Sequence, residues 1–271
     1  MLFHSTKKIL RSLFLFISLK NCICCDASAE DDGGWTTDPE TRIAQPGPCN
    51  IEIRGDDLTQ EEFLERYAHQ APLILRGVTD NKVFAWLSRK DNMLQEYGSK
   101  IIRLSSANTH SYSKVDVSLE KYVEEILGPQ GLDSLGNETM IWFGDNNHTE
   151  WKKLFDSYLQ PPYRLPGLTG AYSFGLAGPG TGVPFHFHGP GFAEVIYGRK
   201  RWFLYPPHQE PRFNPDKTTL HWLLDEYPNL HGSDMPYECT MGPGEVLYFP
   251  DHWWHGTLNI DTSVFISTFL G

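Results

Sequence analysis

The chain has 271 residues, of which 40% are hydrophobic and 13% aromatic, which is ample for a packed core in one large domain or two small ones. Its 34 acidic and 23 basic residues leave a formal net charge of -11 at pH 7. Because phosphate binding requires clustered Lys and Arg, this balance argues against a nucleic-acid partner, and the composition is that of a globular protein.

The first 29 residues have the order of segments that is typical of a secretory signal peptide. A basic start that ends at Arg11 precedes an apolar run over residues 13–19, and Ala27-Ser28-Ala29 fits a small-residue cleavage site. The apolar run is far shorter than the roughly 20 residues of a membrane span, so we expect no transmembrane helix in the mature chain. An uncleaved membrane anchor is the alternative interpretation.

The cysteines and the glycosylation triplets agree with entry into the secretory pathway. Only Cys49 and Cys239 remain after cleavage, and in an oxidising lumen we expect them to form one disulfide, with two unrelated buried thiols as the alternative. Triplets that begin at Asn137 and Asn147 are acceptors for N-linked glycans. Each triplet alone is a weak signal, and their weight comes from agreement with the signal peptide.

The first half of the chain predicts a mixture of helices and strands. Residues 30–48 are acidic, contain Gly and Pro and lack apolar periodicity, so we expect a flexible, solvated arm and a folded domain that begins at Cys49. Apolar spacing then predicts a short helix over 58–67, a buried strand over 73–75 and a second helix over 118–127.

The second half changes character, because short aromatic and β-branched runs alternate with Gly and Pro. They predict strands over 171–176, 192–197, 201–205, 245–249 and 263–269, with a hairpin turn at 198–200. This pattern favours an antiparallel barrel or sandwich. Without an internal repeat or a linker, we expect one domain over 49–271, with a helical or mixed cover (49–160) packed around a β core (161–271).

Two histidines separated by one residue are the first candidates for metal ligands. Side chains at positions i and i+2 of an extended chain emerge on the same face, so His186 and His188 can bind one ion. His255 can supply a third imidazole if its segment folds alongside. Histidine pairs at this spacing also occur in loops without metal, and from the residues alone that interpretation stays open.

Three segments, over 180–188, 192–207 and 242–255, resemble in order and spacing the segments around the iron site of the Jumonji-C branch of the cupin superfamily. The likeness covers nearly all of residues 50–271 and is strong to a small member associated with the endoplasmic reticulum lumen. It implies a double-stranded β-helix (jelly-roll) fold with a helical N-terminal cover. It also implies dependence on Fe(II) and 2-oxoglutarate, with His186, His188 and His255 at the metal.

The resemblance gives two further residues a role in binding the co-substrate. Lys200 matches the lysine that binds the 2-oxoglutarate carboxylate, although the residues alone favour a solvated turn lysine. Ser267, on the last predicted strand, is a further candidate polar contact. Trp202 is interpreted as packing, because large aromatic side chains at strand ends usually are.

The chain departs from the family pattern at two positions. The family holds its metal with two histidines and one carboxylate, whereas here His188 stands at the carboxylate position, which leaves three neutral imidazoles. Zn(II), or no metal at all, therefore stays an alternative to Fe(II). Val183 stands where many members have a Thr that hydrogen-bonds the co-substrate. Asp251 and Glu194 are the nearby acids that we consider as substitutes for the missing carboxylate.

Two functional hypotheses stay level. The chain is either a lumenal Fe(II)- and 2-oxoglutarate-dependent oxygenase that hydroxylates protein side chains, or a catalytically degenerate Jumonji-C fold that regulates a lumenal protein partner. A zinc or nickel cupin with a structural metal ranks behind both. The unusual second ligand leaves enzymatic activity open.

Overall fold

The computed structural model describes residues 31–36 and 43–271 of the chain. The predicted signal peptide, residues 1–29, lies outside the described residues. We expected residues 30–48 to form a solvated arm, but in the described part of this segment Trp35 and Ile43 are buried against the folded domain. The Trp35 indole donates a hydrogen bond to the carbonyl oxygen of Ser88 at 2.9 Å. Contacts with the domain therefore begin before Cys49.

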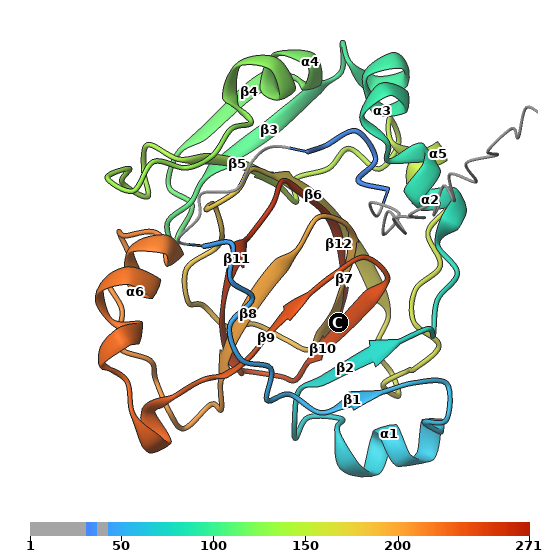
Figure 1. Ribbon diagram of the computed structural model, residues 1–271. Helices are drawn as coiled ribbons and strands as arrows, with labels where there is room; N and C mark the ends of the chain where they lie inside the picture. Colours follow the sequence, from blue (N-terminus) through green and yellow to red (C-terminus); the bar gives the residue numbers. More distant parts are fainter. Residues whose placement is uncertain (1–30, 37–42) are drawn as a thin grey trace, which may run out of the picture. The chain divides into compact units, whose positions relative to one another are not determined.

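Strands dominate the described part of the chain and form two sheets around a barrel-like core (Figure 1). Within the described residues, a nine-stranded sheet has the order β1-β2-β10-β7-β12-β6-β5-β3-β4, and a three-stranded sheet has the order β11-β8-β9. The strands in chain order are β1 (Ile53–Arg54), β2 (Leu73–Arg76), β3 (Ile101–Ser106), β4 (Lys114–Ser118), β5 (Met140–Phe143), β6 (Gly170–Ala177), β7 (Gly191–Tyr197), β8 (Lys200–Tyr205), β9 (Tyr237–Met241), β10 (Glu245–Phe249), β11 (Trp254–Asn259) and β12 (Ser263–Leu270).

The core between the two sheets follows from the alternation of side chains along each strand. On β8, Trp202 and Leu204 pack against Leu247 and Phe249 of β10, whereas the intervening Phe203 packs on the other side against helix α6 (Thr219–Asp225). Apolar side chains on both faces of β8 are therefore covered. The expected mainly β fold, with two sheets around one core, is confirmed.

The helices lie on the outside of the sheets (Figure 1). Phe84 of α2 and Met93 of α3 belong to the same buried cluster as Trp142 of β5 and Leu176 of β6, so these helices cover one face of the large sheet. The helical segments are α1 (Gln60–Arg66), α2 (Lys82–Leu87), α3 (Lys90–Tyr97), α4 (Leu119–Lys121), the π-helical turn η1 (Tyr122–Ile126), α5 (Lys152–Phe155), α6 (Thr219–Asp225), and the 3-10 turns η2 (Tyr227–Asn229) and η3 (Gly232–Asp234). In the described part of the chain, none of these helices has the length and apolarity to cross a membrane.

Most of the predicted elements are present. The five strands of the second half correspond to β6, β7, β8, β10 and β12, and the first predicted helix is α1. The helix predicted over 118–127 is α4 followed by the π-helical turn η1. The cover is more strand-rich than expected, because the first half contributes β1 to β5 to the large sheet, where β2 pairs with β10 and β5 with β6.

The hairpin predicted at 198–200 is wrong, because the two strands that it connects belong to different sheets. β7 pairs with β10 and β12, whereas β8 pairs with β9 and β11. Gly198 has a φ of 75°, and a Cβ atom there would lie 2.2 Å from the carbonyl oxygen of Thr262. Glycine therefore permits the tight corner at which the chain crosses from one sheet to the other.

The predicted disulfide is present and joins Cys49 to Cys239 on β9, across 190 residues of sequence. The neighbouring Asn50 strengthens this attachment, because its backbone N–H donates to the Glu238 carbonyl oxygen at 3.0 Å. Its side-chain oxygen accepts from the Glu238 backbone N–H at 2.7 Å. The N-terminal segment is thus fastened along the outer edge of β9, the strand next to β8.

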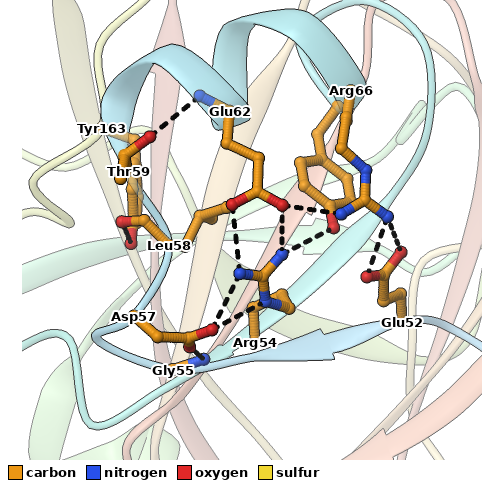
Figure 2. A network of polar contacts seen from close by, with 10 residues as sticks. Glu52, Arg54, Gly55, Asp57, Leu58, Thr59, Glu62, Arg66 and Tyr163 are labelled. Carbon is orange, nitrogen blue, oxygen red and sulfur yellow. Dashed lines mark hydrogen bonds and ion pairs between the residues drawn. The ribbon is translucent and has the colours of Figure 1, made fainter.

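A network of ion pairs fastens α1 over β1 (Figure 2). The Arg54 guanidinium donates to Glu62 at 2.6 Å and to Asp57 at 2.8 Å, and Arg66 donates to the same Glu62 at 2.7 Å. Thr59 caps the helix, since its hydroxyl oxygen accepts from the Glu62 backbone N–H. Most of these charges are partly solvated, so the network positions the helix more than it stabilises the fold.

Candidate metal centre

Three histidines from two chain segments meet inside the barrel. The segment that carries His186 lies antiparallel to β11, where His186 and His255 form a two-residue bridge. Each donates its backbone N–H to the carbonyl oxygen of the other, at 3.1 and 2.8 Å. His188, two residues further on, joins them, and one nitrogen from each of the three rings lies within 4.8 Å of the other two. The predicted grouping of these residues is therefore present in the structure.

Backbone carbonyl groups determine which ring nitrogen of each histidine points into the site. Nδ1 of His186 lies 2.8 Å from the Pro184 oxygen, Nδ1 of His188 lies 2.8 Å from the Gly189 oxygen, and Nδ1 of His255 lies 2.9 Å from that of Trp253. A carbonyl oxygen only accepts hydrogen bonds, so each Nδ1 must carry the proton. In the neutral ring this leaves every Nε2 with a free lone pair.

Those lone pairs face one another. Nε2 of His188 lies 3.2 Å from Nε2 of His255, a distance at which two acceptors repel unless a cation lies between or beside them. Burial lowers the pKa of His186 to about 4 and that of His255 well below its usual range, and the neighbouring imidazoles lower both further. The rings are therefore neutral at pH 7, and three converging imidazole nitrogens are the donor set of a divalent transition metal.

A small cavity of about 20 Å³ lies beside the three imidazoles. This is room for one water molecule or an ion of similar size. Phenylalanine rings fill much of the surrounding space: the Phe143 and Phe265 centroids are 5.3 Å apart, and Phe249 and Phe269 are 6.4 Å apart. The lining residues are Phe143, Val183, His186, His188, Lys200, Trp202, Phe249, His255, Thr257, Phe265, Ser267 and Phe269.

Both predicted co-substrate residues, Lys200 and Ser267, line this cavity. The interpretation of Lys200 as a solvated turn residue is wrong, because the side chain is only 3% exposed. Its Nζ atom donates to Oδ1 of Asn259 at 3.0 Å and lies 3.8 Å from the centre of the Phe265 ring. Burial lowers the pKa of Lys200 to about 7. The amine is thus already hydrogen-bonded within the protein.

Neither nearby acid takes the place of the missing carboxylate. Glu194 on β7 is buried with Asn81 and Tyr158, which donate to its carboxylate at 2.9 and 3.1 Å, and burial raises its pKa. Asp251 pairs with the ring of His252 at 2.9 Å. In the described part of the chain, the group of side chains that can hold a metal here consists of histidines alone.

Three polar residues of the site were not assigned to it from the sequence. Asn259 holds Lys200, the Thr257 hydroxyl accepts from the Val183 backbone N–H at 3.1 Å, and Trp202, expected to be packing only, lines the cavity. Alternation along β8 contains the signal for Trp202, because residues 200 and 202 face the same side of the strand. Asn259 and Thr257 are recognisable only once β11 is known to pair with β8.

The side chains of the two predicted glycan acceptors, Asn137 and Asn147, lie at the surface away from this cavity. Both are exposed. The side-chain oxygen of Asn147 accepts from the backbone N–H groups of Thr149 and Glu150, each at 3.2 Å. The side-chain oxygen makes these bonds, so the Asn147 amide nitrogen, the atom to which a glycan would be attached, takes no part in them.

Comparison with known proteins identifies the family. The Cupin-like domain family matches residues 137–267. JmjC domain-containing protein 8 of Homo sapiens is 57% identical over 245 residues, which are 90% of this chain and 92% of that protein. The 2-oxoglutarate and iron-dependent oxygenase JMJD4 of Gallus gallus is 26% identical over 204 residues, 65% of this chain and 47% of that protein. The solved structure of YcfD, a ribosomal oxygenase from Escherichia coli in complex with cobalt and succinic acid, has a TM-score of 0.50 and 18% identity, covers 79% of this chain and 52% of that one, and agrees with the fold. The chain therefore belongs to the family of JmjC domain-containing protein 8, whose JmjC domain is of the Cupin-like type.

Proposed function

We propose that this chain is a lumenal JmjC protein that holds one divalent metal on three histidines and acts as a regulatory module, without turnover of 2-oxoglutarate. The observation that carries the metal is the convergence of three Nε2 lone pairs, with the Nε2 atoms of His188 and His255 only 3.2 Å apart. A bound cation would remove the repulsion between these lone pairs.

Iron(II) is the first candidate for the metal, because the chicken relative is described as iron-dependent. Imidazole also suits Zn(II), Ni(II) and Cu(II), so the donor set alone does not select iron. A metal on three neutral rings keeps its full charge, whereas a carboxylate ligand would cancel part of it. When bound, the metal would supply a Lewis acid at the three histidines.

The site fits a metal ion better than it fits 2-oxoglutarate. A cavity of about 20 Å³ is far smaller than a five-carbon dicarboxylate, and usual ligand pockets have roughly 300 Å³ or more. Lys200, the residue expected to bind its carboxylate, already donates to Asn259. Val183 offers no hydroxyl group in place of the family's Thr. These features favour the regulatory hypothesis over the oxygenase hypothesis.

Metal analysis of the purified chain tests the first half of this proposal. We expect about one equivalent of iron or zinc in the wild type, and its loss in His255→Ala. His252→Ala is the matched control, because this exposed histidine lies three residues away and pairs with Asp251 outside the site. Equal metal content in all three proteins, or none in the wild type, would overturn the metal centre.

Turnover of 2-oxoglutarate tests the second half. We expect no succinate from the iron-loaded wild type, and none from His188→Asp, because restoring the carboxylate does not enlarge the cavity. Succinate production by the wild type would establish the oxygenase hypothesis. Production by His188→Asp alone would mean that the cavity opens readily and that only the ligand was lost.

The lumenal location rests on separate observations. The disulfide between Cys49 and Cys239 is stable in an oxidising compartment, and both Asn137 and Asn147 are exposed for glycan transfer. We expect a glycosidase that removes N-linked glycans to increase the gel mobility of the protein from cells. Two glycans should give two shifts in gel mobility, and each of Asn137→Gln and Asn147→Gln should remove one of them. Unchanged mobility in all three cases would contradict the lumenal proposal.

A further inference from the structure

One residue that lines the cavity, Trp202, has a buried hydrogen-bond donor without an acceptor. Nε1 of Trp202 is buried and has no hydrogen-bond partner, whereas the corresponding atoms of Trp35 and Trp222 donate to backbone carbonyl oxygens at 2.9 Å. Buried N–H groups without an acceptor are rare in folded proteins. Among the described residues, the buried side-chain atoms without a partner are Gln130 Oε1, Trp202 Nε1, Thr219 Oγ1 and Thr268 Oγ1, and of these residues Trp202 lines the metal cavity.

The indole of Trp202 is held in place from several sides. Its ring stacks on Phe249, with centroids 5.8 Å apart and planes 18° apart, and it lies 5.9 Å from the His255 ring. Trp202 occupies the central strand of the small sheet, between Thr257 on β11 and the disulfide-bonded Cys239 on β9. The indole cannot turn to reach another acceptor without disturbing this packing.

The surroundings define what kind of acceptor belongs here. Three neutral imidazoles leave a divalent metal with its full positive charge, and the buried Lys200 beside the cavity is a hydrogen-bond donor. The remaining walls are largely phenylalanine rings. The positive charge of a metal on the three imidazoles favours a negatively charged acceptor, and the cavity of about 20 Å³ beside the imidazoles restricts that acceptor to one particle of the size of a water molecule.

We infer that the site takes a single small anion, bound to the metal and hydrogen-bonded by Trp202 Nε1–H, in place of a dicarboxylate. This inference rests on the proposed metal centre. The class of ligand is a monodentate anion of the size of hydroxide or fluoride. Trp202 then acts as a binding residue that selects the metal's remaining ligand, and its N–H is no longer left without an acceptor.

Fluoride binding to the cobalt(II)-loaded full chain tests the inference. Visible absorption of cobalt(II) reports on its ligands, so fluoride can be titrated directly. Trp202→Phe removes the N–H and keeps an aromatic ring, and we expect unchanged cobalt binding with fluoride affinity reduced about tenfold or more. Trp254→Phe is the control, since Trp254 contacts Phe187 outside the cavity and its replacement should change neither affinity.

A measurement on the wild type covers the case in which Trp202→Phe does not fold. In the zinc-loaded protein, the Trp202 Nε1–H proton resonance should move downfield when fluoride is added, while that of Trp254 stays unchanged. Cobalt binding with equal fluoride affinity in the two proteins, or an unmoved resonance, overturns the inference and leaves the metal centre intact. Succinate binding as tight as fluoride also overturns it. Absence of any cobalt spectrum overturns the metal centre and the inference together.

Discussion

Lys200→Met is a sharp test of the buried interior, because it removes a charge and keeps a side chain of similar length. The residue is 3% exposed, and its amine donates a hydrogen bond to Asn259 and lies over the face of the Phe265 ring. Burial lowers its pKa from 10.5 to about 7. Between these two pH values the unfolded chain binds a proton that the folded chain does not, so the stability of the wild type rises with pH.

The magnitude follows from this difference in pKa. Each pKa unit corresponds to about 1.4 kcal/mol, so the folded wild type carries a penalty of about 4 to 5 kcal/mol near pH 7. Methionine has no charge to bury, so this penalty is absent in the variant. The substitution leaves Asn259 Oδ1 without its donor, which costs about 1 to 3 kcal/mol. At pH 6.5 we therefore expect Lys200→Met to be more stable than the wild type by about 2 kcal/mol. At pH 9.5 the penalty has mostly vanished, and the gain should fall to zero or reverse.

Urea denaturation of the metal-free proteins at the two pH values measures the effect. Lys82→Met serves as the control, because that lysine is exposed and its substitution should leave the pH dependence unchanged. A Lys200→Met protein that is less stable than the wild type by the same amount at pH 6.5 and 9.5 would refute the reasoning. It would mean that the amine is charged and well solvated in the folded state.

Three further predictions concern the fold around the site. Cys239→Ser should lower the free energy of unfolding by about 2 to 5 kcal/mol in urea without reductant, and reductant should remove most of the difference. Gly182→Ala should lower the melting temperature strongly, because the new Cβ atom would lie 1.8 Å from the Thr257 carbonyl oxygen. Gly128→Ala is the control, since its Cβ atom would meet no atom within 4 Å and the free energy of unfolding should change by about 0.5 kcal/mol or less. Burial raises the pKa of Glu194, so the contribution of this group to stability is fully present below the unfolded pKa near 4.5 and is lost as pH rises through the folded pKa. In urea denaturation between pH 4.5 and 7, Glu194→Gln should therefore reduce the fall in unfolding free energy with rising pH.

The sequence predicted the parts of the fold that depend on local pattern. Apolar and aromatic runs located β6, β7, β8, β10 and β12, and the helix that begins after Thr59 was located by its spacing. The alternation of side chains along an extended segment placed His186 and His188 on one face. The third histidine required knowledge of how distant segments pair, and its assignment came from resemblance to a known family.

Features that depend on pairing between distant strands could not be predicted. Gly198 was interpreted as a hairpin turn, because a tight turn between two strands looks the same in sequence whether or not the strands pair. Lys200 looked like a solvated residue for the same reason, since its burial depends on β9 and β11 on either side of β8. The volume of the cavity depends on phenylalanine rings from several strands and is likewise invisible in local pattern.

The histidine at position 188 suits the aromatic rings that surround it. The ring centroid of His188 lies 5.4 Å from that of Phe249 and 4.9 Å from that of Phe269. A carboxylate packed against these rings would be less well solvated than in water whenever the metal was absent, which is unfavourable. A neutral imidazole avoids most of that cost, because its Nδ1–H donates to the Gly189 oxygen and burial keeps its pKa low. In this chain aromatic rings occupy part of the space around position 188, and a neutral imidazole there needs less solvation than a carboxylate when the metal is absent.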